Sequence, residues 1–257
     1  MEFYYPLLIV LAYLLGSVSA SIMLSKYVYG IDIRTLGSTN AGANNVQRIF
    51  GWKAGMLVLV FDFLKGVAAV SLVSLTKYEH ETELFVGFQI LLGTAVILGH
   101  IFPLFFRFRG GKGVAALCGV LFAIHPWAVL ICAGVFLIVF LLTRYISASV
   151  IAAVTAYPIF INSIFALWLQ PEETFTLKIF SIIIAAIIWL THLSNIKRLF
   201  RGREEKFALR KPVDSPFLLR GKRGKFSCYK FALKFLKNRT IFGAIFLKIY
   251  TIFALNF

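Results

Sequence analysis

The 257-residue chain is poor in acidic residues: 11 Asp and Glu stand against 27 Lys and Arg, which gives a formal net charge of +16. Charged residues make up only 15% of the sequence, whereas 60% of the residues are hydrophobic and the mean hydropathy is +0.84. A composition this apolar excludes an ordinary soluble domain and is typical of an integral membrane protein. The excess of Lys and Arg indicates a polyanionic partner: lipid headgroups, nucleic acid or phosphorylated metabolites.

Cysteine is also scarce, and Cys118, Cys132 and Cys228 lack the spacing of metal ligands. We therefore expect no disulfide framework, no metal site and no cofactor. The first six residues, Met1 to Pro6, lack the basic region of a signal peptide, so the apolar stretch that follows is expected to be retained as a membrane helix.

Apolar runs long enough to cross a hydrocarbon core of about 30 Å recur along the chain. They cover Tyr4 to Met23, Met56 to Leu75, Leu84 to Phe106, Ala148 to Leu169 and Leu177 to Leu193. A further run, Val114 to Thr143, is interrupted by His125 and Pro126. It either crosses once or forms a helical hairpin, with at least one short, tilted or re-entrant half.

Loop charge favours the hairpin, because cytoplasmic loops collect Lys and Arg. The segments Lys26 to Lys53 and Arg107 to Lys112, and the tail after Asn195, are basic, whereas Lys77 to Glu83 and Pro171 to Lys178 carry glutamates. Only a hairpin keeps the basic segments on one side. The sequence thus predicts an all-α polytopic membrane helical bundle of about seven transmembrane or partly spanning helices, with the N-terminus outside and the C-terminus cytoplasmic.

Two polar stretches on the predicted cytoplasmic side are rich in glycine. Gly37 to Arg48 combines glycines, amides and an arginine, which suits an anion, although a polar loop that caps the next helix explains it equally simply. Gly99 to Gly113 ends in Gly110-Gly111-Lys112-Gly113, which aims N–H groups and a lysine at an anion or forms a basic turn. It lacks the spacing of a Walker loop.

Two further polar stretches and one buried pair complete the set. Ser147 follows Arg144 by one helical turn, so the two could share a ligand, and His192 and Asn195 lie at i, i+3. Helix capping and headgroup contacts are the simpler interpretations of both stretches. Asp62 and Lys65 lie inside an apolar run, where a charge costs at least about 2.5 kcal/mol, so we expect a structural pair that faces the bundle interior.

These stretches together resemble the acyl-phosphate-dependent glycerol-3-phosphate acyltransferases of bacterial membranes. The family's first motif, close to Gly-Ser-Gly-Asn-x-Gly-Ala-Thr-Asn-Val-x-Arg, is matched from Gly37 to Arg48, with Thr39 in place of a glycine and Asn44 in place of a threonine. The family's Asp-x-x-Lys-Gly and Gly-His-x-Phe-Pro-x-Phe motifs are matched by Asp62 to Gly66 and by Gly99 to Phe105. The remaining matches run over Gly110 to Ala115 and His192 to Glu204, so the resemblance covers roughly residues 5 to 205.

The resemblance implies transfer of a fatty acyl group from acyl phosphate to the 1-hydroxyl of glycerol 3-phosphate, giving lysophosphatidic acid and phosphate, the first step of phospholipid synthesis. It implies a multi-pass protein of the bacterial cytoplasmic membrane whose active site faces the cytoplasm. The residues expected to bind substrate or act in catalysis are Ser38, Asn40, Asn45, Arg48, Lys112, Ser147, His192 and Asn195. The expected phosphate-loop glycines are Gly37, Gly42, Gly110, Gly111 and Gly113, and the expected supporting residues are Asn44, His100, Arg144, Arg198 and Glu204.

The expected partners are glycerol 3-phosphate, acyl phosphate and membrane lipid, and no nucleic acid. We predict an acyltransferase domain over residues 1–205, followed by a basic, partly amphipathic extension over 206–257 of unknown role. The alternative function is a transporter or channel for an organic phosphate, which also needs basic groups and glycine-broken helices. Transporters usually show an internal repeat, and none is visible in this sequence.

Overall fold

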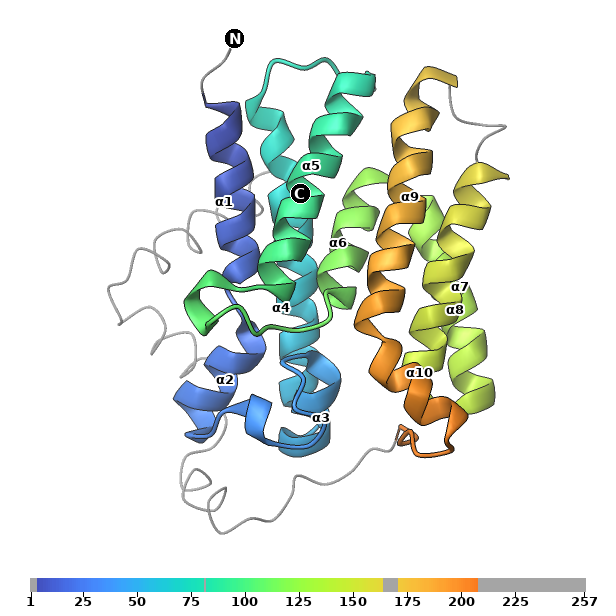
Figure 1. The fold of residues 1–257 in the computed structure, drawn as a ribbon. Helices are drawn as coiled ribbons and strands as arrows, with labels where there is room; N and C mark the ends of the chain where they lie inside the picture. Colours follow the sequence, from blue (N-terminus) through green and yellow to red (C-terminus); the bar gives the residue numbers. More distant parts are fainter. Residues whose placement is uncertain (1–3, 81, 164–170, 208–257) are drawn as a thin grey trace.

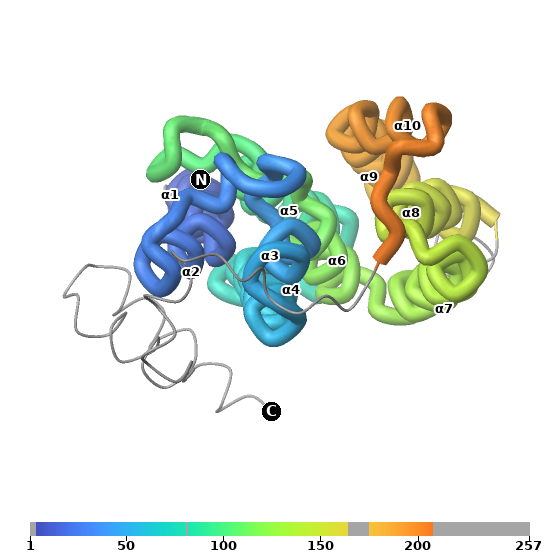
Figure 2. The backbone as a smooth tube through the Cα atoms, turned by 90° about the horizontal axis from the view of Figure 1, so that it is seen from below, coloured from blue at the N-terminus to red at the C-terminus, as the bar shows by residue number. Residues whose placement is uncertain are grey.

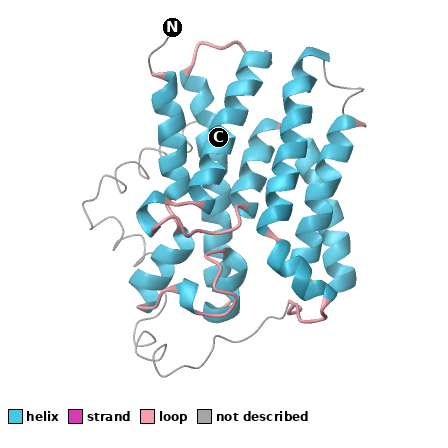
Figure 3. Cartoon of the chain, in the orientation of Figure 1, coloured by secondary structure: helices cyan, strands magenta, loops and turns pink. Residues whose placement is uncertain are grey.

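A computed structural model describes residues 4–80, 82–163 and 171–207, and within these ranges the chain is helical with no strand (Figures 1 and 3). The α-helices are α1 Tyr5–Ser17, α2 Ala20–Tyr29, α3 Ala43–Phe50, α4 Trp52–Ser71, α5 Glu83–Ile101, α6 Val114–Ile124, α7 Pro126–Thr143, α8 Ile146–Asn162, α9 Pro171–Thr191 and α10 Leu193–Phe200. Short 3₁₀ turns are η1 Ile33–Thr35, η2 Leu72–Leu75 and η3 Leu104–Phe106. The predicted all-α class is confirmed.

Among the described residues, three helical segments are long and apolar enough to cross a membrane: Trp52–Leu75, Glu83–Phe106 and Pro126–Thr143. Two bent pairs, α1 with α2 and α9 with α10, raise this number to five if each pair is one span. On α7 the side chains of Leu141 and Leu142 are 62% and 80% exposed. Exposed apolar side chains of this kind are stable in contact with lipid hydrocarbon, so the structure is consistent with an integral membrane protein.

Small residues let pairs of helices approach closely. A Cβ added at Gly66 of α4 would clash with the carbonyl of Ala116 on α6, and one added at Gly119 of α6 would clash with the carbonyl of Phe63. Gly99 of α5 lies in the same way against the carbonyl of Tyr13 on α1. Close backbone contact is the usual way to pack helices in lipid, where burial of apolar surface gives little drive to associate.

The run Tyr4 to Met23 does not form the single helix that the sequence predicted. It breaks after Ser17, and α1 and α2 meet at an angle of 42°. The ammonium of Lys65 donates to the carbonyls of Gly16 and Val18 at 3.2 and 3.0 Å, which satisfies backbone groups that the break leaves without helical partners. Asp62 pairs with Lys65 at 2.8 Å and both side chains are buried.

The run from Val114 to Thr143 divides at the expected place into two helices, α6 and α7. His125 caps α7 by accepting a hydrogen bond from the N–H of Ala128 at 3.1 Å, and Pro126 is the first residue of α7. Because proline suits the first turn of a helix and disfavours a helical residue before it, this pair enforces the break. The two helices run in opposite directions (Figure 1).

Several elements mark the two ends of the bundle. The starts of α5 and α9 lie at the upper end in Figure 1, while α2, α3 and α10 lie at the lower end. Seen from below, α1 to α6 form one group and α7 to α10 a second group beside it (Figure 2). The predicted connection Pro171 to Lys178 belongs to α9, and the predicted span Ala148 to Leu169 is described only to residue 163.

Candidate functional site: an anion pocket at one end of the bundle

The stretch Gly37 to Arg48 is a short loop followed by α3, so Asn44, Asn45 and Arg48 are helical. Asn45 holds the loop together: its Nδ2 donates to the carbonyls of Ile33, Leu36 and Asn40 at 3.2, 2.9 and 3.1 Å. Its Oδ1 accepts from the N–H of Ser38 at 3.0 Å. Asn45 is 2% exposed, so its amide shapes the loop that presents Ser38 and Asn40.

Two loop positions adopt left-handed backbone conformations. Gly37 has φ +56°, and an added Cβ would clash with the amide oxygen of Asn45. Thr39, which stands where the resembled motif has glycine, has φ 59°. A β-branched residue in this region is strained, because its Cβ crowds the backbone. Gly42 is extended, and a Cβ there would press on the side chain of Asn40.

Gly110 and Gly111 of the second stretch do not offer free N–H groups as the sequence suggested. The N–H of Gly110 donates to the carbonyl of Ile101 at 3.1 Å, and that of Gly111 donates to the carbonyl of His100, also at 3.1 Å. A Cβ on Gly111 would clash with the ring of His100 and crowd the carbonyl of Ala41. These glycines therefore permit close packing against the end of α5, and Gly113, at φ +83°, begins the turn into α6.

The packing presents Lys112 to α10 in the second helical group. Its ammonium donates to Oδ1 of Asn195, which is buried. Nδ2 of Asn195 donates to the Glu204 carboxylate at 2.6 Å, and the same oxygen accepts from Ser147 at 2.8 Å. Arg198 donates to the other oxygen at 2.7 Å. The Glu204 carboxylate thus accepts hydrogen bonds from three residues that the sequence analysis singled out, and Lys112 is linked to it through Asn195.

The charges in this cluster shift two pKa values. Burial and the positive charge of Arg198 lower the pKa of Lys112 to about 8, although Glu204 partly opposes them. For Glu204, burial raises the pKa, but hydrogen bonds from Arg198, Asn195 and Ser147 outweigh it and leave the pKa below its ordinary value. The cluster therefore holds an anion among cations and polar donors, which is the arrangement that a bound phosphate requires.

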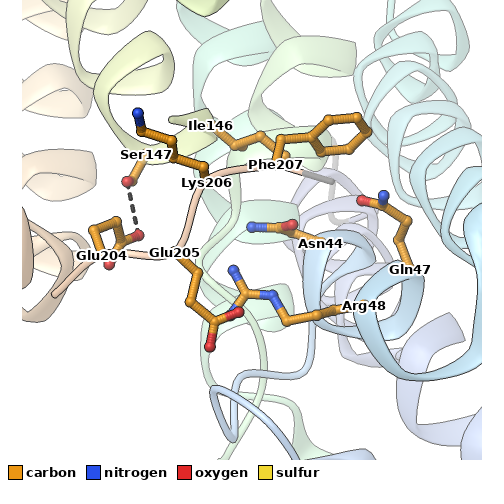
Figure 4. Close-up of a pocket in the computed structure, with 9 residues that line it drawn as sticks. All are labelled: Asn44, Gln47, Arg48, Ile146, Ser147, Glu204, Glu205, Lys206 and Phe207. Carbon is orange, nitrogen blue, oxygen red and sulfur yellow. Dashed lines mark hydrogen bonds and ion pairs between the residues drawn. The ribbon is translucent and has the colours of Figure 1, made fainter. Parts of the chain in front are cut away.

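A pocket beside this cluster lies between α3 and the start of α8 (Figure 4). It contains about 370 Å³ of space, part of it open to solvent. It is lined by Asn44, Gln47, Arg48, Ile146, Ser147, Glu204, Glu205, Lys206 and Phe207. The guanidinium of Arg48 lies 3.3 Å from the carboxylate of Glu205. Arg48 and Ser147, far apart in sequence, thus line one pocket.

Glu205 and Gln47 were missed by sequence reasoning. The signal for Glu205 was available, since it is one of the few acidic residues in a largely basic tail. The segment that carries it is tied to the bundle, because the N–H of Phe207 donates to the carbonyl of Arg144 at 2.7 Å. Arg144 contributes this backbone group and is the left-handed C-cap of α7, so Arg144 and Ser147 do not lie on one helix as expected.

His192 and His100 are buried next to the site. Nδ1 of His192 donates to the carbonyl of Ile188 at 2.8 Å, and His192 is the residue at which α9 bends by 60° into α10. Nδ1 of His100 lies 3.5 Å from Asp62, so the buried pair extends to the glycine loop through this ring. Within residues 4–80, 82–163 and 171–207, no group of three His, Cys, Asp or Glu residues could hold a metal ion.

Comparison with known proteins identifies relatives of this chain. Residues 6–202 match the family model described as glycerol-3-phosphate acyltransferase. A glycerol-3-phosphate acyltransferase of Chlorobaculum parvum is 39% identical over 220 residues, covering 77% of this chain and 94% of the relative. One of Chlorobaculum tepidum is 38% identical over 222 residues, with 78% and 95% covered.

Two solved structures are also similar. The glycerol 3-phosphate form of PlsY, an integral membrane glycerol 3-phosphate acyltransferase, superposes with a TM-score of 0.69 at 36% identity, covering 79% of this chain and 96% of that one. The lysophosphatidic acid form of PlsY gives a TM-score of 0.67 at 35% identity, with 80% and 96% covered.

Proposed function

The chain belongs to the glycerol-3-phosphate acyltransferase family of integral membrane enzymes, and from this premise we propose that it acylates glycerol 3-phosphate with acyl phosphate as donor. The products are 1-acyl-glycerol 3-phosphate, which is lysophosphatidic acid, and inorganic phosphate. The relatives' names and the two forms of PlsY support the acceptor and the lipid product. The donor is our inference from the sequence resemblance.

The observation that carries the proposal is that Asn195 and Ser147 donate to one carboxylate, that Lys112 donates to Asn195, and that Arg48 lines the adjoining pocket. Both substrates are phosphate-bearing anions. A site for two such groups needs cations that stay close together at neutral pH and hydroxyl or amide donors between them. The Glu204 carboxylate marks a position where these donors already converge on an anion.

In the proposed step, the 1-hydroxyl oxygen of glycerol 3-phosphate attacks the carbonyl carbon of acyl phosphate. The bond from that carbon to the phosphate oxygen then breaks, and phosphate leaves. The hydroxyl proton passes to a phosphate oxygen of the substrate. Because acyl phosphate is already activated and the hydroxyl attacks it directly, no covalent enzyme intermediate is needed.

Site residues supply position and charge for this step. Arg48 and Lys112 neutralise phosphate, and Ser147, His192 and Asn195 orient glycerol 3-phosphate. Ser38 and Asn40, on the loop shaped by Asn45, stabilise the oxyanion that develops on the carbonyl. Preorganised donors of this kind act without rearranging during the reaction, which is why the buried hydrogen bonds of Asn45 matter to catalysis.

We further propose the topology and location that the sequence predicted. The five candidate spans and the two shorter apolar helices, α6 and α8, account for seven segments that cross or enter the bilayer. The basic segments then lie in the cytoplasm and the acidic connections outside, as the positive-inside rule requires. The protein is accordingly placed in the bacterial cytoplasmic membrane with its pocket at the cytoplasmic face.

The acyltransferase domain is proposed to cover residues 1–205, with 206–257 as an extension of unknown role. The family match ends at residue 202, which supports this boundary. The basic and aromatic stretch that suggested an interfacial helix lies outside the described residues.

An assay on purified protein in vesicles separates this function from transport. Radiolabelled glycerol 3-phosphate is mixed with a long-chain acyl phosphate, and label is then measured in the lipid extract and inside the vesicles. An acyltransferase transfers label to the lipid extract only when acyl phosphate is present. Label that accumulates inside vesicles without lipid product would refute the enzyme and favour the organic-phosphate carrier.

A further inference from the structure

A turn of unusual backbone precedes the lysine of the anion site. Arg107 and Phe108 are consecutive and have φ values of 58° and 56°. Residues with side chains avoid this left-handed region because the Cβ crowds the carbonyl oxygen, and two in succession are rarer still. Local sequence preference does not explain the turn, so contacts from elsewhere in the fold must hold it.

The guanidinium of Arg34 supplies such a contact on both sides of the strained pair. Its Nη1 donates to the carbonyl of Phe106 at 2.8 Å and to that of Arg109 at 3.2 Å. These are the residues immediately before and after Arg107 and Phe108. A single nitrogen thus fixes the two ends of the turn at once.

The rest of the guanidinium is held rigidly. Nε and Nη2 of Arg34 donate to the two carboxylate oxygens of Asp32 at 3.0 and 2.8 Å. Asp32 also caps η1 through the N–H of Arg34 and pairs with Lys26 at 3.2 Å. Hydrogen bonding to Arg34 lowers the pKa of Asp32 well below its ordinary range, so the carboxylate stays charged at neutral pH. Such a bidentate pair restricts the orientation of the guanidinium.

The two segments joined by Arg34 lead directly to the anion site. η1 ends at Thr35, two residues before Gly37, and the clamped turn ends at Arg109, three residues before Lys112. The same two segments meet again where Gly111 packs against the carbonyl of Ala41. Arg34 therefore sets the position of the lysine loop relative to the loop that carries Ser38.

We propose that Arg34 is a positioning residue for the acyl transfer, acting through the Arg107–Phe108 turn on Lys112; its kinetic consequence rests on the proposed function. Without the clamp, the turn relaxes and Lys112 is correctly placed in only a fraction of the molecules. Apparent affinity for the anionic substrate then falls by that fraction, while saturating substrate restores the competent state. KM therefore rises and kcat is largely kept.

Kinetics of Arg34→Ala test this role. We expect KM for glycerol 3-phosphate to rise about tenfold with kcat within about threefold of wild type, because other tethers of the turn remain. One of these tethers is the hydrogen bond from the N–H of Phe108 to the carbonyl of Pro103 at 3.0 Å. Guanidinium chloride at tens of millimolar should restore KM, whereas sodium chloride at equal ionic strength should not. A lowered kcat with unchanged KM, or no rescue, would overturn the positioning role.

Limited trypsin digestion tests the clamp without reference to any reaction. Arg107 and Arg109 are exposed, and a protease needs a relaxed backbone, so cleavage after them should be about tenfold faster in Arg34→Ala than in wild type. Cleavage at the wild-type rate would overturn the clamp. If the wild-type protein forms no product, the proposed function is refuted. The digestion rates would still test whether Arg34 holds the Arg107–Phe108 turn.

Two further variants serve as controls: one covers the case in which Arg34→Ala does not fold, and the other changes a neighbouring side chain of the same turn. Arg34→Lys keeps one positive charge, but its ammonium lacks the planar fork that binds both oxygens of Asp32 while a separate nitrogen reaches the two carbonyls, so KM should still rise several-fold. A folded Arg34→Lys protein with wild-type KM and digestion rate would overturn the proposal even if Arg34→Ala failed to fold. Arg109→Ala removes a neighbouring exposed side chain and leaves its carbonyl in place, so it should match wild type in KM.

Discussion

Replacing Lys112 by alanine removes the cation that joins the glycine loop to Asn195. In the proposed complex Lys112 pairs with a substrate phosphate, and truncating one member of such a hydrogen-bonded charge pair costs about 2 to 5 kcal/mol. Because Lys112 is partly exposed to solvent, we take a loss of binding free energy near the lower end of this range, about 2.7 kcal/mol, which corresponds to a hundredfold change. Lys112→Ala should therefore lower kcat/KM at least about a hundredfold, and Arg48→Ala should do the same because Arg48 lines the adjoining pocket.

The pH dependence of kcat/KM tests whether the charged ammonium of Lys112 is required for activity. With its pKa lowered to about 8, Lys112 in the free enzyme is charged below that pH and loses its proton as the pH rises through it. The value of kcat/KM reflects the ionisation of the free enzyme and the free substrate, and the substrate phosphate loses its second proton near pH 6. We therefore expect kcat/KM to be level between about pH 6 and 8 and to fall above pH 8, where Lys112 loses its charge. Lys112→Arg keeps its charge and should lack the alkaline fall.

Lys197→Ala is the matched control, because Lys197 is an exposed lysine on α10 close in sequence to Asn195. Steady-state kinetics on purified protein with an unchanged size-exclusion profile give the comparison. Lys112→Ala with kcat/KM within a few-fold of wild type would refute the reasoning, as would an alkaline limb shared by wild type and Lys112→Arg.

Three other substitutions follow from the same geometry. Thr39→Gly relieves the left-handed strain and should raise the melting temperature by an amount equivalent to roughly 0.5–1 kcal/mol, whereas a lower melting temperature would show that the loop needs threonine. Glu205→Gln frees Arg48 from a partly exposed ion pair worth at most about 1 kcal/mol, so KM for the anionic substrate should fall two- to fivefold; a rise would mean that Glu205 aids binding. Asp62→Leu leaves the Lys65 ammonium buried without its carboxylate and should cost about 3–5 kcal/mol, seen as lost yield and a lower melting temperature, and wild-type thermal stability would contradict it.

The sequence predicted the all-α class and the break at His125 and Pro126, but not the break after Ser17 or the hydrogen-bond partners of the polar residues. The run Tyr4 to Met23 is mostly apolar. Gly16, Ser17 and Ser19 flank the bend at Val18, but small residues of this kind are also common within straight membrane helices. The bend depends on Lys65, which lies in another helix and donates to the freed carbonyls. A hydrogen bond between distant segments leaves no mark in hydrophobic periodicity.

The roles of individual polar residues were harder still to infer. Glycines at 110 and 111 suggested N–H groups for phosphate, yet the end of α5 takes both donors. Asn45 suggested a substrate contact, yet its amide is engaged by four backbone groups. Residue type limits what a side chain can bond to, but only the packed structure determines which partner is within reach.

A structure of this protein with glycerol 3-phosphate bound tests the central claim most directly. We predict a phosphate within hydrogen-bonding distance of Lys112 and Arg48, with the Arg48–Glu205 pair opened and the 1-hydroxyl near Ser147. A phosphate bound away from both cations, with the hydrogen bond from Lys112 to Asn195 and the Arg48–Glu205 pair unchanged, would contradict the account.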